Sequence, residues 1–207
     1  MLFKLLIVLV MLAPQQERLA DRIVAIVNDE PIMLSELHQS SMADLSAQPD
    51  QSNVLQSRLE SRINQTLILQ EARRLRIFSV TPAEIEEYRA QLLQQFDGDQ
   101  GAMLARMAAS GVRPEEINAV IERLLLIREF VDYRFRRSVQ LEEEDLLNYY
   151  ETTFSEDFRR RNPMNPVPQF ESVRSLIRTL LIERNVNDAI QQWLADARAR
   201  AQIVIRF

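Results

Sequence analysis

The residues that could carry out chemistry are few in this 207-residue chain, and their types exclude most enzymes. The sequence has no cysteine, so it offers no thiol nucleophile, disulfide or thiolate zinc site. His38 is the single histidine, which rules out an H-E-x-x-H motif and leaves one candidate for every catalytic triad. The three glycines cannot form a dinucleotide or phosphate-binding loop. We therefore predict a protein that is not an enzyme and needs no cofactor.

Two acidic segments could hold a cation. Residues 97–101 begin like a calcium-binding loop, but Ala102 and Ala108 occupy the sixth and twelfth positions, where that loop needs Gly and Glu. Residues 142–145 are four consecutive acids, and consecutive side chains point in different directions on a helix. A turn and a solvated first helical turn explain these segments better, so no metal site is predicted.

The charge balance argues against binding to nucleic acid. The chain has 25 Lys and Arg against 30 Asp and Glu, a net charge of −5, and Lys4 is the only lysine. A nucleic-acid binder needs a positive surplus to displace counterions from phosphates. Two basic runs, 134–137 and 159–161, could grip acidic client segments, phosphates or anionic headgroups, although charge-complemented helix ends are the ordinary interpretation.

Binding through apolar surface is the chemistry that remains. Methionine and aromatic side chains adapt to many partners, so they are the candidates for contacting a polypeptide client. The same residues at helical spacing usually belong to a core, and only those exposed as a patch would count. The candidates are Met33, Met42, Tyr88, Phe96, Met103, Met107, Tyr133, Phe135, Tyr149 and Tyr150.

The elements that must position these residues are mostly helices. A β-branched run at 23–27 predicts a strand, a turn at 28–31 and a second short strand at 32–34 follow, and Ser35 is expected to cap a helix. Further helices are predicted over 55–75, from Pro82 to Phe96, over 102–109, over 114–137, from about 142 through Tyr150, and over 170–200. Residues 203–207 read as a terminal strand, which needs a partner for its backbone, and we expect it to pair with 23–27.

The chain divides into four predicted segments. Residues 1–20, with Lys4 before a short apolar run, have the form of a secretory signal peptide and leader, although an ordinary buried strand is the alternative. Residues 21–158 form an N-terminal helical region. Residues 159–169 contain three prolines and form a linker, and residues 170–207 supply the last helix and strand.

Several of these segments together resemble the SurA family of periplasmic chaperones. Residues 21–37 are similar to that family's opening strand, hairpin turn and first helix. Other matching segments, in the same order as in the family, are 59–75, 80–85, 117–141 and 170–207. The resemblance implies a mainly α, multi-helix chaperone core with a small β element that pairs the N-terminal and C-terminal strands.

One departure from the family is important. SurA-like proteins usually carry parvulin-type prolyl isomerase domains before the C-terminal helix, whereas residues 159–169 stand in that place here. A folded domain needs roughly 50 residues, so isomerase activity is expected to be absent. The resemblance then implies an ATP-independent periplasmic holdase that binds unfolded polypeptides, chiefly outer-membrane β-barrel precursors.

Two other functions stay open at this point. The chain could be a non-catalytic assembly or scaffold subunit of the cell envelope with one fixed protein partner, or an accessory to separate isomerases. A homodimer formed by exchange of a helix or strand, and transient proximity to the membrane, are also compatible with the sequence.

Overall fold

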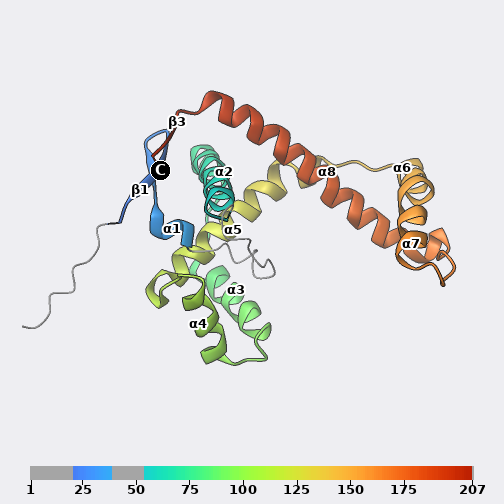
Figure 1. Cartoon of the computed structure of the whole chain (residues 1–207), viewed down its shortest axis with the longest axis horizontal. Helices are drawn as coiled ribbons and strands as arrows, with labels where there is room; N and C mark the ends of the chain where they lie inside the picture. The colour runs from blue at the N-terminus through green and yellow to red at the C-terminus, as the bar shows by residue number, and fades with distance from the viewer. Residues whose placement is uncertain (1–20, 39–53, 207) are drawn as a thin grey trace, which may run out of the picture.

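The computed structural model describes residues 21–38 and 54–206, which are arranged along one long C-terminal helix (Figure 1). The predicted leader 1–20 and Met42 lie outside the described residues. The elements are β1 (Ile23–Val27), β2 (Glu30–Met33), α1 (Leu34–His38), α2 (Val54–Leu75), α3 (Pro82–Gln94), α4 (Gln100–Ala109), the 3-10 turn η2 (Pro114–Glu116), α5 (Ile117–Arg134), the 3-10 turn η3 (Arg136–Ser138), α6 (Glu143–Tyr149), the π-helical turn η4 (Tyr150–Phe154), α7 (Ser155–Arg161), α8 (Phe170–Arg200) and β3 (Ile203–Ile205). The predicted mainly α fold class is confirmed.

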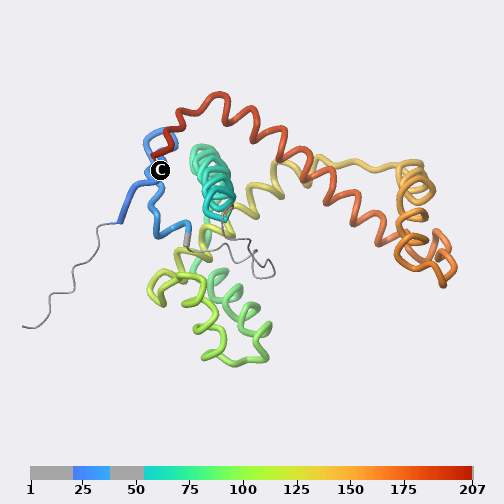
Figure 2. Tube along the Cα trace, viewed as in Figure 1, coloured from blue at the N-terminus to red at the C-terminus, as the bar shows by residue number. Residues whose placement is uncertain are grey.

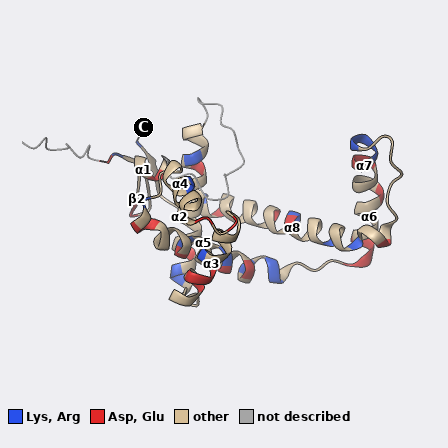
Figure 3. Cartoon of the chain, turned by 90° about the horizontal axis from the view of Figure 1, so that it is seen from below, with Lys and Arg blue, Asp and Glu red and all other residues tan. Residues whose placement is uncertain are grey.

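Three groups of elements follow from this order. The base consists of the three strands, α1, α2, the C-terminal half of α5 and the C-terminal half of α8. The side lobe consists of α3, α4 and the N-terminal half of α5. The arm consists of residues 139–181, with α6, η4, α7 and the start of α8, and it stands apart from the base in both views (Figures 2 and 3).

The strands at the two ends of the described chain pair, as the sequence predicts. The sheet order is β2-β1-β3, and β1 is antiparallel to both neighbours, with Ala25 opposite Ile205 and Val27 opposite Ile203. Asn28 closes the pair, since its N–H donates to the carbonyl of Gln202 at 2.7 Å. Asn28 has φ +55°, a left-handed conformation that asparagine tolerates well. The sheet therefore ties the start of the described chain to its end.

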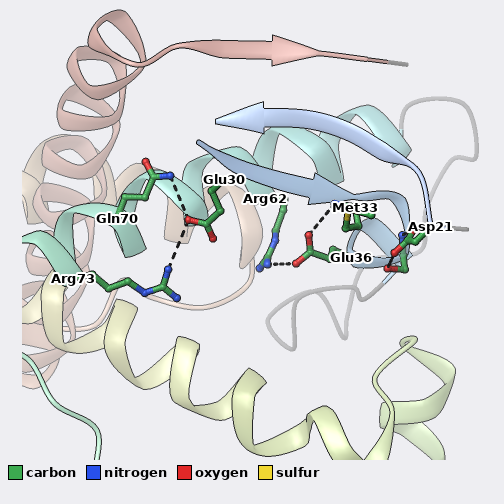
Figure 4. A network of polar contacts seen from close by, with 8 residues as sticks. Asp21, Glu30, Met33, Glu36, Arg62, Gln70 and Arg73 are labelled. Carbon is green, nitrogen blue, oxygen red and sulfur yellow. Dashed lines mark hydrogen bonds and ion pairs between the residues drawn. The ribbon is translucent and has the colours of Figure 1, made fainter. Parts of the chain in front are cut away.

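The start of α1 differs from the expectation that Ser35 caps it. The helix begins one residue earlier, at Leu34, and Ser35 is a donor: its backbone N–H bonds the Asp21 carboxylate at 3.1 Å, and its hydroxyl also contacts Asp21. Glu36 accepts from the N–H of Met33 at 2.9 Å (Figure 4). Two carboxylates thus satisfy the first amides, because β2 runs directly into the helix and leaves no free cap position.

Polar contacts hold the β1–β2 hairpin against α2 (Figure 4). The Gln70 side chain donates to the carbonyl of Val27 at 3.1 Å and to the Glu30 carboxylate at 3.3 Å. Arg73 lies 3.7 Å from the same carboxylate, and Arg62 pairs with Glu36. The hairpin is thereby fixed at both ends on one helix.

Apolar packing of the base centres on Phe130, which is fully buried. Its ring meets Phe78, Phe135 and Trp193 at centroid distances of 6.1, 5.9 and 5.4 Å. These aromatic residues come from the segment after α2, from the end of α5 and from α8. α5 ends at Arg134, directly before Phe135, and the predicted helix over 114–137 is divided into η2, α5 and η3.

The side lobe begins at the predicted capping box. The Thr81 hydroxyl accepts from the N–H of Glu84, and the Glu84 carboxylate accepts from the N–H of Thr81 at 2.7 Å. This pairing lowers the pKa of Glu84, because the backbone N–H of Thr81 favours the ionised carboxylate. Gly111, with φ +77°, follows α4 in the left-handed conformation expected of it.

The arm has a small core of its own. Leu146 of α6 packs with Ile177 and Leu181 of α8, and half-buried aromatic side chains surround them. α7 continues to Arg161, so the first three residues of the predicted linker 159–169 are helical, and residues 162–169 make the connection to α8. No described helix has both the length and the hydropathy that crossing a membrane requires.

Candidate functional site

Burial separates the candidate client-binding residues. Met103, Met107 and Phe135 are buried, with at most 6% of their surface exposed, so they are core residues of the side lobe and base and offer no binding surface. The reason is that each lies on the inward face of a helix or helix end where other elements converge. Tyr133 is 49% exposed and is the one candidate of large exposure among the described residues.

The other described candidates are half-buried and lie apart from one another. Tyr88 and Phe96 pack against the core of the side lobe. Tyr149 and Tyr150 pack against the core of the arm, and Met33 lies at the end of β2. The nine candidates within the described residues therefore do not form a single patch.

A different set of residues is both apolar and exposed. Tyr133 meets Phe78 at 5.6 Å between ring centroids, and the neighbour of Phe78, Ile77, is 56% exposed. On α8, Leu176 and Leu180 are 50% and 41% exposed. We define Ile77, Tyr133, Leu176 and Leu180 as the apolar surface.

Leu176 and Leu180 have the four-residue spacing that is typical of a buried helical stripe, yet both are exposed. The adjacent pairs 176–177 and 180–181 give α8 two apolar faces. Ile177 and Leu181 of these pairs cover Leu146 of the arm, which leaves Leu176 and Leu180 uncovered. This doubled apolar spacing is a sequence signal that could have identified them as exposed.

Arg136 links the two halves of the apolar surface. Its guanidinium bonds Glu183 of α8 at 2.6 Å and Asp132 of α5 at 2.8 Å. Leu176, Leu180 and Glu183 are spaced by four and three residues, so they share one face of α8. That face is therefore turned toward the end of α5, where Tyr133 lies. The hydrogen bond from Arg136 lowers the pKa of Glu183 below its ordinary value of 4.5.

In both basic runs, 134–137 and 159–161, arginine side chains form ion pairs with carboxylates or lie over aromatic rings. Arg160 pairs with Asp157, and Arg137 lies over the Tyr133 ring at 5.8 Å from its centroid. Figure 3 shows acidic and basic residues interspersed along α6, α7 and α8. This mixture fits helix ends with complemented charge better than a continuous cationic surface.

The two acidic segments serve as helix starts. Asp99 caps α4, with its carboxylate accepting from the N–H of Ala102 at 3.0 Å, and Asp145 accepts from the N–H of Glu142 at 2.9 Å. Within residues 21–38 and 54–206, no three His, Asp or Glu side chains are grouped so that they could hold a metal ion.

Comparison with known proteins gives a structural match. A scan against models of protein families finds no match, and neither does a search of the curated proteins. Among solved structures, the chain is similar to one from the pair PEB4 and Cj1289 of Campylobacter jejuni, described as structurally related SurA-like chaperones. The TM-score is 0.55 at 12% sequence identity, over 89% of this chain and 98% of that chain. At this identity the likeness shows the fold, which is SurA-like.

Proposed function

We propose that this chain is an ATP-independent periplasmic holdase, which binds unfolded polypeptides, outer-membrane β-barrel precursors among them, and does not isomerise prolines. The observation that carries this proposal is the apolar surface, which is exposed on both the base and the arm. Exposed apolar residues that are grouped rather than scattered mark sites of protein interaction. The SurA-like fold supports the assignment to a chaperone.

The form of the apolar surface suits clients of many sequences. Leucine, isoleucine and tyrosine side chains bury apolar area without demanding a charged partner, at about 25 cal/mol per Å². Arg136 lies between them and pairs with the carboxylates of both Glu183 and Asp132, so its positive charge is compensated within the protein. A segment rich in apolar and aromatic residues, as in an unfolded β-barrel strand, would be retained on such a surface.

Two further features support the proposal that the chain lacks isomerase activity and is exported to the periplasm. Residues 162–169 connect α7 to α8 and are too few for a folded domain, which needs roughly 50 residues. The predicted leader 1–20 supports export to the periplasm. A homodimer remains a prediction, which light scattering of the purified chain would test.

The test is suppression of aggregation of a urea-unfolded outer-membrane β-barrel protein diluted into buffer without nucleotide. We expect the purified chain to suppress light scattering in proportion to its concentration. The double variant Leu176→Ser/Leu180→Ser should need several-fold more protein for the same effect. The proposal is wrong if the unaltered chain neither suppresses aggregation nor binds the client. A single tight partner recovered from envelope extracts, with no effect on aggregation, would support a scaffold subunit instead.

Leu147→Ser is the matched control. Leu147 is 40% exposed, almost the same as Leu180, but it lies on α6. Glu143 precedes Leu147 by one turn on α6 and pairs with Arg174 and Arg178. These two arginines lie on the side of α8 opposite Leu176. The control should therefore keep full activity. A loss equal to that of the double variant would show that general surface hydrophobicity, and not this surface, is responsible.

A further inference from the structure

A polar pocket lies between α6 and α8. Its volume is about 360 Å³. Of its two polar residues on α8, Asn185 lies roughly 140–180° around the helix from Leu180 and Leu176, whereas Arg184 lies about 40° from Leu180, at the border of the apolar surface. The lining residues are Gln140, Leu141, Asp145, Asn148, Tyr149, Thr152, Thr153, Leu181, Arg184 and Asn185.

The pocket has three walls. Asp145, Asn148 and Thr152 recur at spacings of three and four, so they form one stripe along α6 and η4. Arg184 and Asn185 lie on the facing stretch of α8. The third wall, Gln140 and Leu141, belongs to the connection between η3 and α6. All three walls belong to secondary structure or its direct connections, so the pocket is formed by the arm together with the next turn of α8.

The π-helical turn η4 shapes the first wall. The N–H of Ser155 bonds the carbonyl of Tyr150, five residues earlier, and this wider turn brings two successive threonines to the pocket. The Thr152 hydroxyl bonds the carbonyl of Asn148 at 2.7 Å, and Tyr150 is held by a 2.7 Å bond to the carbonyl of Pro168. π-Helical turns are rare and frequently occur at functional sites.

The polar groups of the walls are mostly uncharged and free to bind. The side-chain amides of Gln140, Asn148 and Asn185 make no hydrogen bond to any residue of the described ranges. The Asp145 carboxylate already accepts from the N–H of Glu142, and Arg184 lies 3.9 Å from Asp188. An amide offers both a donor and an acceptor, as a peptide group does. The three walls therefore present donors and acceptors that match the N–H and carbonyl groups of a polypeptide backbone.

We propose that this pocket binds a short extended stretch of polypeptide, held by its backbone peptide groups and not by its side chains. The volume is near the lower end of the range of about 300–1,000 Å³ for ligand pockets, which suits a few residues. The walls hold one carboxylate, that of Asp145, against three side-chain amides, which favours peptide groups over a ligand bound chiefly through hydroxyl donors. This inference rests on the proposed chaperone function and adds a contact that does not depend on apolar clients.

The test is fluorescence anisotropy of a labelled, uncharged peptide of Gly, Ser, Thr and Asn residues, titrated with the full chain. Asn185→Leu and Asn148→Leu should each weaken binding about three- to tenfold, the effect of losing one or two hydrogen bonds. Asn187→Leu is the matched control, an exposed asparagine on the same helix outside the pocket, and should change affinity less than about twofold. Circular dichroism confirms that each variant is folded.

A backbone N-methylated peptide of the same sequence separates backbone from side-chain recognition. It lacks the N–H donors, so it should bind at least tenfold more weakly. Equal binding of the two peptides, or equal effects of Asn185→Leu and Asn187→Leu, would overturn the proposal. Binding of a neutral disaccharide in place of the peptide would overturn it in favour of a saccharide site. If aggregation suppression persists while peptide binding to the pocket is absent, only the pocket proposal fails. If both are absent, the holdase function fails as well.

Discussion

The base and the arm are built on the same helix but are stabilised very differently. In the base, the sheet, α1, α2, α5 and the second half of α8 converge on a core with Phe130 at its centre. In the arm, three buried residues, Leu146, Ile177 and Leu181, form the core, and half-buried aromatic rings complete it. The arm can keep its position with so little packing because α8 is fixed in the base.

The two regions also differ in how far apart along the chain their partners lie. The base joins Ala25 to Ile205, so it needs almost the whole chain to be in place. The arm is closed by contacts within residues 139–181 and by α8. Regions with few buried contacts open locally at lower free energy than the core. The difference therefore suggests a rigid base and a readily opened arm, with the proposed polypeptide contacts placed along α8 between and beside them.

The largest expected effect is from Phe130→Ala in the base. This change removes a fully buried ring with three aromatic neighbours, and it should lower the free energy of unfolding by about 3–5 kcal/mol. Urea unfolding followed by circular dichroism measures it. Phe154→Ala, which removes a half-buried ring of the arm, is the matched control and should cost clearly less. Equal losses would show that the arm contributes as much to global stability as the base.

Ile177→Ala should affect the arm selectively. Ile177 is fully buried between α8 and α6, so its truncation removes packing worth about 2–5 kcal/mol at that place. We expect faster amide hydrogen exchange over residues 143–161 and unchanged exchange in β1 and α2. Leu176→Ala, at the exposed neighbouring position, should leave both regions unchanged. Uniformly faster exchange throughout the chain would mean that base and arm unfold together.

Much of the fold could be predicted from the sequence, because its signals are local and agree with one another. The β-branched run at 23–27 and the terminal strand were each recognisable, and backbone hydrogen bonding required them to pair. The Thr81 capping box marked the start of α3, and α8 has the predicted bounds, 170–200. The start of α1 was misassigned, because Asp21, fourteen residues away, satisfies the N–H of Ser35.

The candidate site could be predicted less well, because exposure depends on which elements meet. Met103 and Met107 have a composition that suits client binding, yet the packing of α3, α4 and α5 buries them. Leu176 has the spacing of a core residue, yet half of its surface is exposed. The polar pocket has no sequence signal at all, since it depends on a π-helical turn and on the approach of α6 to α8.

A smaller effect is expected where Arg136, at the end of α5, bonds Glu183 of α8. We call this contact the joint between the base and the arm. Arg136→Gln removes the bonds to Asp132 and Glu183, which are partly exposed, so the loss of stability should stay below about 1 kcal/mol. A double-mutant cycle with Glu183→Gln measures the coupling, which should shrink as salt is added. Arg160→Gln, which breaks the Arg160–Asp157 pair inside the arm, is the control for losing a surface ion pair. A coupling of several kcal/mol, insensitive to salt, would mean that the joint is a rigid structural contact.

The smallest effect concerns pH. Hydrogen bonds from Arg136 and Arg174 lower the pKa of Glu183 and of Glu143 below the ordinary value of 4.5. A carboxyl whose pKa is lower in the folded state adds stability above its unfolded pKa, and this stability is lost as the pH falls through the folded value. The difference in unfolding free energy between the wild type and Glu183→Gln should therefore be constant from pH 7 to about 5, decline as the pH falls below 4.5, and disappear once the pH is below the folded pKa of Glu183.

NMR titration of the side-chain carboxyl carbons measures both pKa values directly. Glu183 reports on the joint, whereas Glu143 reports on the arm alone, because its partner Arg174, at 2.8 Å, belongs to the arm. Arg136→Gln should raise the pKa of Glu183 toward 4.5 and leave that of Glu143 unchanged. If both values move together, the charge at the joint controls the conformation of the arm, and the two regions are coupled more tightly than their separate cores imply.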